Sequence, residues 1–166
     1  MNSSEQNISS TSIEKSIWEI LETVCDPEVP VLSILDLGIV RDIKLTEEEV
    51  EIIITPTYSG CPAMDAISID IKLKLIEYGY KKIKITSILS PAWTTDWMSE
   101  EGKRKLKEYG IAPPGKLSNG ASEHLPICPQ CNSTNTKLLS QFGSTACKAL
   151  YQCNDCKEPF DYFKCH

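Results

Sequence analysis

Residues 55–65 read TPTYSGCPAMD and follow VEIII at residues 50–54, an apolar run typical of a buried strand. They precede a long segment that ends at Gly79. Pro62 suits the first position of a helix, because its fixed φ is helical and its missing N–H needs no partner there. This predicts Cys61 at the helix N-cap, where free N–H groups and the helix dipole favour a thiolate over a thiol. Cys61 is therefore a candidate for nucleophilic or metal chemistry, although a buried cysteine packed under the loop would explain the same pattern.

The composition is that of a soluble globular protein. The chain has 166 residues, of which 41% are hydrophobic and 24% charged, enough for one domain with a core and a small appendage. Its net charge of -6 argues against sequence-independent binding to nucleic acid, which rests on Lys and Arg contacts to phosphates. The first fifteen residues hold no signal-peptide core, and no apolar run approaches the roughly 18 residues of a membrane span. We therefore expect a cytoplasmic protein with neither nucleic-acid nor membrane partners.

Eight cysteines in a reducing compartment favour metal binding or thiol chemistry over a disulfide framework. Four of them form two C-x2-C pairs, CPQC at 128–131 and CNDC at 153–156. Each pair presents two thiolates from one tight turn, and two turns complete a tetrahedral shell of four sulphurs. A segment of about forty residues cannot bury enough surface to fold alone, so a metal is expected to hold it. We predict one structural zinc, with an iron–sulphur cluster as the alternative, on Cys128, Cys131, Cys153 and Cys156. The roles of three further residues stay open: Cys147, Cys165 and His166.

The N-terminal part of the chain predicts a polar tail followed by a helix. Residues 1–10 are polar and are expected to be disordered. Thr11 and Glu14 have the spacing of a capping box, and helically spaced apolar residues continue from there to Cys25. Pro27 stops this helix, because a residue before proline is pushed out of the α region.

The next segments predict a hairpin, a helix and a third strand. Two β-rich runs, 39–45 and 50–55, flank a short polar loop and indicate the hairpin. Residues 62–79 are ambiguous, because every second residue in part of the segment is apolar, as in a strand: Ile67, Ile69, Ile71, Leu73 and Leu75. The same segment also carries a helical stripe, and its length exceeds that of a usual strand. We predict a helix there, and a strand at 82–89 that runs parallel to a neighbour.

The remaining segments predict a domain boundary. A helix is expected to begin at Thr95 or Asp96 and to run to Tyr109. Residues 112–126 are rich in Pro, Gly and Ser and are expected to form a linker. We therefore predict an α/β (α+β) domain at 11–111, with helices on a small mixed sheet of about three strands. A zinc-ribbon-like β subdomain at 127–166 follows, with short strands near 136–142, 148–152 and 160–164.

Taken as a set, the motifs of this chain resemble the PaaD family. They are DPEVP at 26–30, DLG at 36–38, PTYSGCPA at 56–63, SPAWTTDW at 90–97, GIAPP at 110–114, FGSTACKALYQC at 142–153 and EPFDYFKCH at 158–166. Residues 12–114 are also similar to the broader SufT-like domain of metal–sulphur cluster assembly factors. That domain generally lacks the cysteine-rich tail, so the tail is what points to the PaaD family.

The resemblance implies a mixed-sheet α/β domain and an association with the multicomponent phenylacetyl-CoA oxygenase. That enzyme epoxidises the ring of the CoA thioester in aerobic phenylacetate degradation. The likeness to assembly factors implies maturation of the oxygenase's metal centres. Cys61 matches the functional cysteine of the broader domain, and Asp26 and Glu28 match its acidic motif. The implied cargo at Cys61 is a transiently held iron or iron–sulphur cluster.

The residues supply no oxygenase machinery. The sequence has no pair of E-x-x-H motifs for a di-iron centre, no Gly-rich phosphate fingerprint and only two His residues. We therefore expect an accessory maturation protein and not an enzyme, with the oxygenase subunits and the iron–sulphur assembly machinery as partners. The alternatives are a structural subunit, or a thiol enzyme in which Cys61 attacks a CoA thioester. The second is weakened because no His lies in residues 1–123. The oligomeric state stays open, with a homodimer as one candidate.

Overall fold

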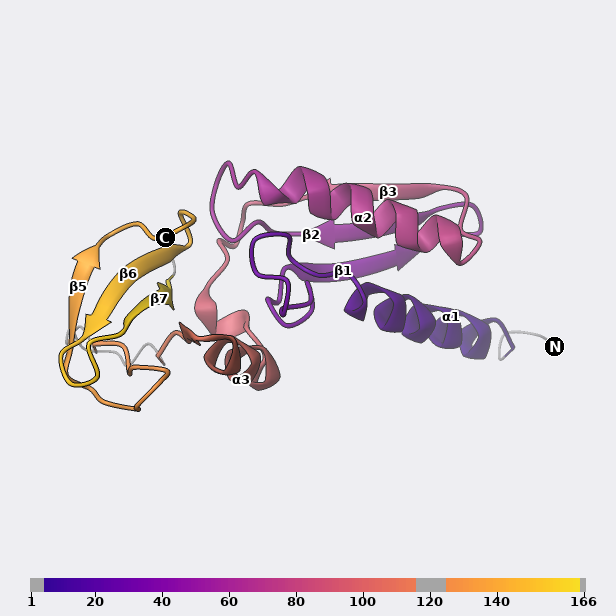
Figure 1. Cartoon of the computed structure of the whole chain (residues 1–166). Coiled ribbons are helices and arrows are strands. Elements are labelled where there is room, and N and C mark those ends of the chain that lie inside the picture. The colour runs from indigo at the N-terminus through magenta and orange to yellow at the C-terminus, as the bar shows by residue number, and fades with distance from the viewer. Residues whose placement is uncertain (1–4, 116–124, 165–166) are drawn as a thin grey trace.

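Three strands form the sheet of the N-terminal domain, in the order β1-β2-β3 (Figure 1). The structure is a computed structural model that describes residues 5–115 and 125–164. They are β1 (Val40–Leu45), β2 (Val50–Ile54) and β3 (Ile83–Ser87). β1 pairs with β2 antiparallel, as predicted for the hairpin, and β2 pairs with β3 parallel. The mixed three-stranded sheet predicted from the sequence is thus confirmed.

Helices α1 (Glu5–Glu22) and α2 (Ala63–Glu77) contact each other, and they lie against one side of this sheet (Figure 1). Ile17 and Leu21 of α1 and Ile71 of α2 are 0% exposed and meet Ile52 of β2 in the main core. The helix predicted after Pro62 is therefore confirmed, and it buries one stripe of its surface.

The start of α1 differs from the sequence expectation. The helix begins at Glu5, so the predicted capping box at Thr11 lies inside it, and residues 5–10 are helical where a disordered tail was predicted. The expectation of disorder rested on the polarity of residues 1–10, and polarity does not exclude a helix. Residues 1–4 lie outside the described part of the chain.

The other side of the sheet carries charged residues together with Ile53, which is 9% exposed. Glu51 on β2 lies opposite Lys84 on β3, with a carboxylate to ammonium distance of 2.9 Å, and it also accepts a hydrogen bond from the Thr86 hydroxyl at 2.5 Å. Most charged residues of β2 and β3 thus lie on the side of the sheet that the helices do not cover, as is common for a sheet packed on one face.

A buried carboxylate fixes the last helix of the first domain. The short 3₁₀ helix η1 (Thr95–Trp97) precedes α3 (Glu100–Tyr109), which starts later than predicted. Ser99 caps α3 by accepting a hydrogen bond from the Gly102 N–H at 2.8 Å, and its hydroxyl donates to Asp36 at 2.8 Å. The Lys105 ammonium also meets Asp36, at 2.7 Å. Gly110 ends the helix at φ 93°, a left-handed conformation that glycine adopts readily.

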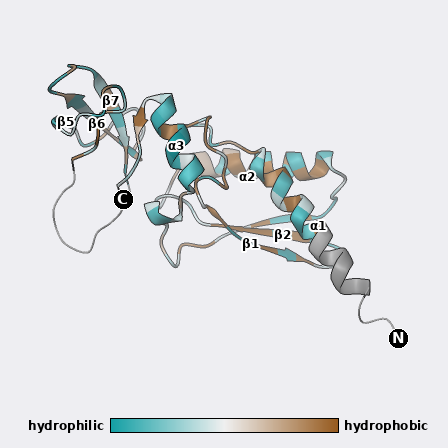
Figure 2. Ribbon diagram, turned by 90° about the horizontal axis from the view of Figure 1, so that it is seen from below, coloured by the Kyte–Doolittle hydropathy of each residue, from teal (hydrophilic) through white to brown (hydrophobic). Residues whose placement is uncertain are grey.

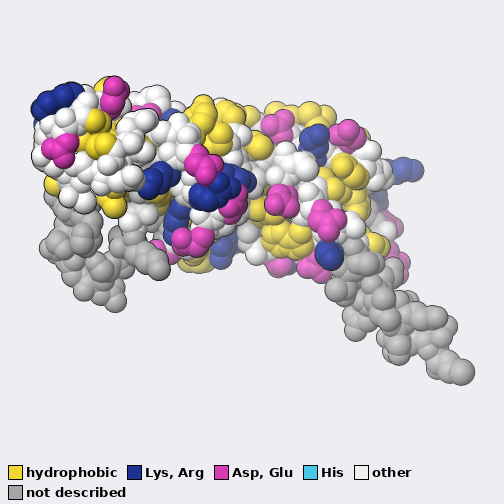
Figure 3. All heavy atoms as spheres, turned by 60° about the horizontal axis from the view of Figure 1, so that its bottom comes forward, with side chains coloured by type: hydrophobic (Ala, Val, Ile, Leu, Met, Phe, Trp, Pro, Cys, Tyr) yellow, Lys and Arg dark blue, Asp and Glu magenta, His cyan; other side chains and the backbone are white. Residues whose placement is uncertain are grey.

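The surface over α3 carries charges of both signs. Arg104 pairs with Glu101 and Glu108 on the same helix, and Lys103 pairs with Glu100. In Figure 3 positive and negative side chains interleave near the middle of the molecule. Figure 2 shows the contrast with β1 and β2, where the hydrophobic colour is prominent.

The C-terminal sheet has the order β4-β7-β6-β5. Its strands are β4 (Ile111–Ala112), β5 (Thr136–Ser140), β6 (Lys148–Cys153) and β7 (Pro159–Phe163). The three short strands predicted for the tail are confirmed. β4 was not predicted, and it spans the expected boundary between the first domain and the linker at 112–126. Residues 116–124 of that linker lie outside the described part of the chain.

The two sheets belong to one packed body. β4 leaves α3 directly and pairs in parallel with β7, so the end of the first domain forms an edge strand of the second sheet. The Trp93 ring of the first domain meets the Phe163 ring of β7 edge to face, with centroids 6.2 Å apart. Phe163 and Cys147 belong to the main core and not to the small core of the tail. None of the helices in the described residues is long and apolar enough to cross a membrane.

Candidate functional site

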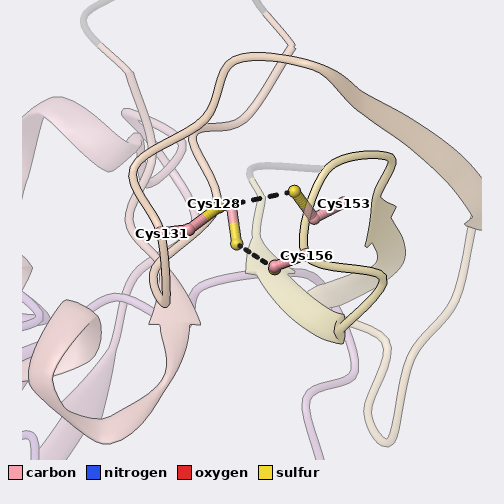
Figure 4. A group of neighbouring side chains, drawn as sticks. All are labelled: Cys128, Cys131, Cys153 and Cys156. Carbon is pink, nitrogen blue, oxygen red and sulfur yellow. Dashed lines mark hydrogen bonds between the residues drawn. The ribbon is translucent and has the colours of Figure 1, made fainter.

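The four cysteines of the two C-x2-C pairs converge from two loops of the tail (Figure 4). Their sulphurs all lie within 4.8 Å of one another. The Cys128 and Cys156 sulphurs are 3.7 Å apart, and those of Cys131 and Cys153 are 3.6 Å apart. A tetrahedral zinc with sulphurs at about 2.3 Å requires edges of about 3.8 Å, so the donors fit such an ion. The predicted ligand set is a metal-binding group.

The two loops that carry these cysteines share one local geometry. The residue after the second cysteine of each pair, Asn132 and Lys157, has a positive φ of 60° and 67° respectively. This left-handed residue turns the chain back beneath the metal position, and the Asn132 N–H donates to the Cys128 carbonyl at 2.9 Å. Asp155 joins the two loops, because it accepts hydrogen bonds from the Ser133 hydroxyl and the Asn135 amide.

The thiols of this group differ in acidity. The backbone N–H of Cys156 is the main cause that lowers the pKa of Cys153 to about 7. The Glu158 N–H would lower the pKa of Cys156, but burial and the neighbouring thiols together outweigh it and raise that pKa to about 12. Of these two thiols, Cys153 therefore loses its proton more readily to an incoming cation.

Cys61 stands just before α2 and is partly exposed. The helix begins at Ala63, with Pro62 in the N-cap position at φ -69° and ψ -21°, so Cys61 lies one residue before its predicted place. The shift is small, because Pro62 already has helical angles and helix boundaries vary by a residue. Cys61 still sits at the N-terminal end of α2, as the Pro62 argument required.

Tyr58, a residue that the sequence argument did not single out, is the hydrogen-bond partner of Cys61. Burial, then the hydrogen bond with Cys61 and the nearby Glu28, raise the pKa of the Tyr58 hydroxyl. The hydroxyl therefore stays protonated and donates to the sulphur. Tyr58 lies three residues before Cys61 in one tight loop, and the Cys61 N–H donates to its carbonyl at 3.3 Å.

The two acidic residues of the DPEVP loop have different hydrogen-bond partners. Asp26 is 8% exposed, and one of its carboxylate oxygens accepts the N–H groups of Glu28 at 2.7 Å and Val29 at 2.9 Å. Burial raises the pKa of Asp26, against the lowering effect of these hydrogen bonds and of Lys148. Glu28 is partly exposed, and its carboxylate accepts a hydrogen bond from the Cys147 thiol.

Cys147 brings the tail to this loop. Its sulphur donates to the Glu28 carboxylate at 3.7 Å, across 119 positions of sequence, and also meets the Thr145 hydroxyl at 3.0 Å. The thiol is 5% exposed, and burial raises its pKa to about 11. The sequence left Cys147 unassigned. Its place in the PaaD-like motif at 142–153, outside both C-x2-C pairs, was the available signal.

A cavity of about 460 Å³ opens beside the Tyr58 loop, between that loop and the aromatic segment that follows β3. Thr55, Tyr58, Leu89 and Trp93 are among its lining residues. The Thr55 hydroxyl is buried and has no hydrogen-bond partner within the described residues. Two residues whose roles the sequence left open, Cys165 and His166, lie outside the described part of the chain.

Two family models match different parts of the chain, and each part contains one set of the candidate site residues. The model described as PaaD zinc beta ribbon domain matches residues 112–164, which contain the four-cysteine group and Cys147. The model described as iron-sulfur cluster assembly protein matches residues 14–79, which contain Asp26, Glu28 and Cys61.

Individual relatives match one or both parts. A protein of Escherichia coli, provisionally named as a subunit of 1,2-phenylacetyl-CoA epoxidase, is 50% identical over 152 residues, covering 90% of this chain and 91% of its own. A protein of Porphyromonas gingivalis named Fe-S protein maturation auxiliary factor is 37% identical over 95 residues, covering 56% of this chain and 90% of its own. The crystal structure of a domain of unknown function from Bacillus anthracis is similar with a TM-score of 0.57 at 30% identity, covering 60% of this chain and 96% of that one.

Proposed function

The chain belongs to the PaaD family, and from this premise we propose that it is a non-catalytic cytoplasmic maturation protein. Its client is the multicomponent phenylacetyl-CoA oxygenase, the ring 1,2-epoxidase of aerobic phenylacetate degradation. Its cargo is iron or an iron–sulphur cluster. The observation that carries the proposal is the partly exposed Cys61 at the start of α2, hydrogen-bonded to Tyr58, within the segment that matches iron–sulphur assembly proteins.

Cys61 and Glu28 supply the donor types that such cargo requires. A thiolate binds iron and iron–sulphur clusters strongly, and a carboxylate adds a harder oxygen donor. The Tyr58 hydrogen bond orients the sulphur without competing as a ligand, because the hydroxyl keeps its proton. Partial exposure lets a partner protein reach the thiol, which transfer demands and a purely structural site does not.

The four-cysteine group has a separate, structural part in the proposal. Four thiolates close the tetrahedral shell of a zinc ion and leave no position for a substrate. Zinc there holds the two loops of the tail together and so keeps the ribbon folded. The pair distances of 3.6 and 3.7 Å support this assignment.

The geometry disfavours a thiol enzyme. A cysteine nucleophile that attacks a thioester needs a base to accept its proton, or strong stabilisation of the thiolate. The side chain hydrogen-bonded to Cys61 is that of Tyr58. Its raised pKa keeps the hydroxyl protonated, so it cannot accept the proton of Cys61.

A constant structural subunit is the second candidate function. The name of the Escherichia coli relative, which describes it as part of the epoxidase, favours this role. The two candidates differ in stoichiometry: a constant component stays with the purified oxygenase in fixed ratio, whereas a maturation protein leaves after delivery.

The test compares oxygenase purified anaerobically from cells that carry this chain as wild type, Cys61→Ser or Cys25→Ser. Cys25 is an exposed cysteine shortly after the end of α1 and serves as the matched control. We expect the oxygenase iron content to fall several-fold with Cys61→Ser and to remain at the wild-type level with Cys25→Ser. Full iron loading with Cys61→Ser would contradict the proposal, and co-purification in a fixed ratio would favour the structural role.

A further inference from the structure

The cavity beside the Tyr58 loop lies at the carboxyl ends of two parallel strands. Residues 55–59 follow β2 directly, and residues 89–93 follow β3. β2 and β3 are parallel, and the Ile88 N–H still pairs with the Ile54 carbonyl at 2.9 Å, so both segments leave the sheet at the same edge. In open α/β sheets, ligands bind outside the carboxyl ends of parallel strands. The cavity therefore has the position of a ligand site.

The segment after β3 lines the cavity with apolar side chains, among them Leu89 and Trp93. The Trp93 side chain is 4% exposed, and its indole N–H donates to the Leu37 carbonyl at 2.8 Å. Its ring also meets the Phe163 ring edge to face. These contacts hold the indole in one orientation, so it offers a preformed surface to an apolar or aromatic group.

The loop after β2 lines the same cavity with residues that carry hydroxyl groups: Thr55, Thr57, Tyr58 and Ser59. The Thr55 side chain is buried, and its hydroxyl has no hydrogen-bond partner within the described residues, although its N–H donates to the Ile39 carbonyl at 2.8 Å. A buried hydroxyl without a partner is costly, and a ligand that pairs with it removes the cost. None of the described residues that line the cavity is charged, so a carboxylate or phosphate would find no counter-charge there.

We propose that this cavity binds an uncharged aromatic acyl compound, whose ring packs on Trp93 and Leu89 while its amide or thioester carbonyl accepts a hydrogen bond from Thr55. The cavity volume of about 460 Å³ is typical of small-molecule sites. The inference goes beyond the proposed function, because it assigns a small-molecule site to the assembly domain and requires no iron. Tyr58 lines the cavity and is hydrogen-bonded to Cys61, so the compound would lie beside the loop that holds this thiol.

The test is an NMR titration of the ¹⁵N-labelled, zinc-loaded full-length chain with phenylacetamide, which joins an uncharged ring to an amide carbonyl. Phenylacetate has nearly the same shape but a negative charge, and it is the matched control compound. We expect phenylacetamide to shift the amide signals of residues 55–59, with a dissociation constant on the order of 1 mM for a probe of about ten heavy atoms. Phenylacetate should bind about tenfold more weakly, because its charge would be desolvated without a partner.

Two substitutions locate the site. Thr55→Val removes the hydroxyl and keeps the shape of the side chain, so phenylacetamide should bind several-fold more weakly. The thermal midpoint of the free protein should not fall, because the lost hydroxyl has no partner there, and Thr55→Ser should restore binding. Leu89→Ser should also weaken binding, whereas Leu73→Ser on α2 should not. Leu89 and Leu73 are 62% and 59% exposed, so the two changes are matched in burial.

Weaker binding in both Thr55→Val and Leu89→Ser, with the preference for the uncharged compound, supports the site. Absence of binding, equal affinity for phenylacetate, or wild-type affinity in both variants overturns it. Should Thr55→Val fail to fold, Leu89→Ser decides, because wild-type affinity in that variant contradicts the inference. None of these measurements involves iron, so their failure leaves the proposed function to be tested by the iron content of the oxygenase.

Discussion

Asp26 accepts two backbone N–H groups with one carboxylate oxygen, and this arrangement fixes the turn that presents Glu28. We predict that Asp26→Ala lowers the free energy of unfolding by about 1–3 kcal/mol, because the buried Val29 N–H loses its partner. Asp26→Asn keeps an acceptor oxygen and should cost less. Denaturant unfolding of both variants measures this difference. An Asp26→Ala protein of wild-type stability that fails only in iron binding would make Asp26 a ligand instead.

At this scale the sequence identifies residue types better than their roles. The two C-x2-C pairs predict the metal-binding group because short spacing fixes which thiols share a turn. Asp26 and Glu28 are close in sequence and are equivalent by pattern, yet one points into its own loop and the other toward Cys147. That division depends on tertiary contacts, which a local pattern does not contain.

The burial of side chains in helix α2 explains why its sequence resembles that of a strand. Ile67, Ile71 and Leu75 are buried, whereas Ile69 and Leu73 of the same alternating series are 57% and 59% exposed. A helix that is apolar on two faces produces the alternation of a strand. The length of the segment and the positions of Pro62 and Gly79 predicted the helix correctly. Proline and glycine restrict where a helix can begin and end, whichever faces of it are buried.

Matched substitutions in α2 distinguish the two faces. Ile71→Ala should destabilise the protein by about 2–5 kcal/mol, since it opens a cavity in the core. Ile69→Ala should change stability by no more than about 0.5 kcal/mol, because this side chain is exposed and Ala favours helices. Thermal or denaturant unfolding provides the measurement. In a strand both residues would share one face, so equal losses would contradict the helix.

Helix α3 depends on the Asp36 carboxylate, which the sequence analysis named only within the DLG motif at 36–38. Although burial opposes it, the hydrogen bonds from Lys105, Ser33 and Ser99 lower the pKa of Asp36 below 3.8. A lowered pKa in the folded state contributes stability that is present above the unfolded value and lost as pH falls through the folded one. We predict that Asp36→Asn is less stable than wild type at neutral pH.

The pH dependence of this difference is the measurement. The gap between wild type and Asp36→Asn should shrink as pH falls below 3.8, where the wild-type carboxyl also becomes neutral. Unfolding experiments across that range would show it. If the difference in stability between wild type and Asp36→Asn stays constant with pH, packing and not the charge of Asp36 causes it.

Across the whole molecule, the tail is part of the main core and not a tethered appendage. β4 pairs with β7, and Trp93 packs on Phe163. The sequence predicted a separate ribbon after a linker because composition changes there. It could not show that β4, only two residues long, joins the second sheet, since so short a strand carries no periodicity.

Removal of zinc should therefore change the structure of both domains. We predict that a strong chelator, or Cys131→Ser, unfolds the ribbon and alters the fluorescence of Trp93 by exposing its contact with Phe163. Zinc content and tryptophan emission are followed together, and Cys25→Ser under the same chelator serves as the reference. Release of zinc with unchanged emission would show that the domains fold independently.

The central claim is that this chain delivers iron to the oxygenase and then leaves it. The direct measurement mixes the iron-loaded, zinc-containing chain with iron-depleted oxygenase under anaerobic conditions and separates the two by gel filtration. The account predicts that iron moves to the oxygenase fraction while the chain elutes free, and that the Cys61→Ser chain transfers none. Iron that stays on the chain, or a chain that remains bound to the oxygenase in fixed ratio, would contradict it.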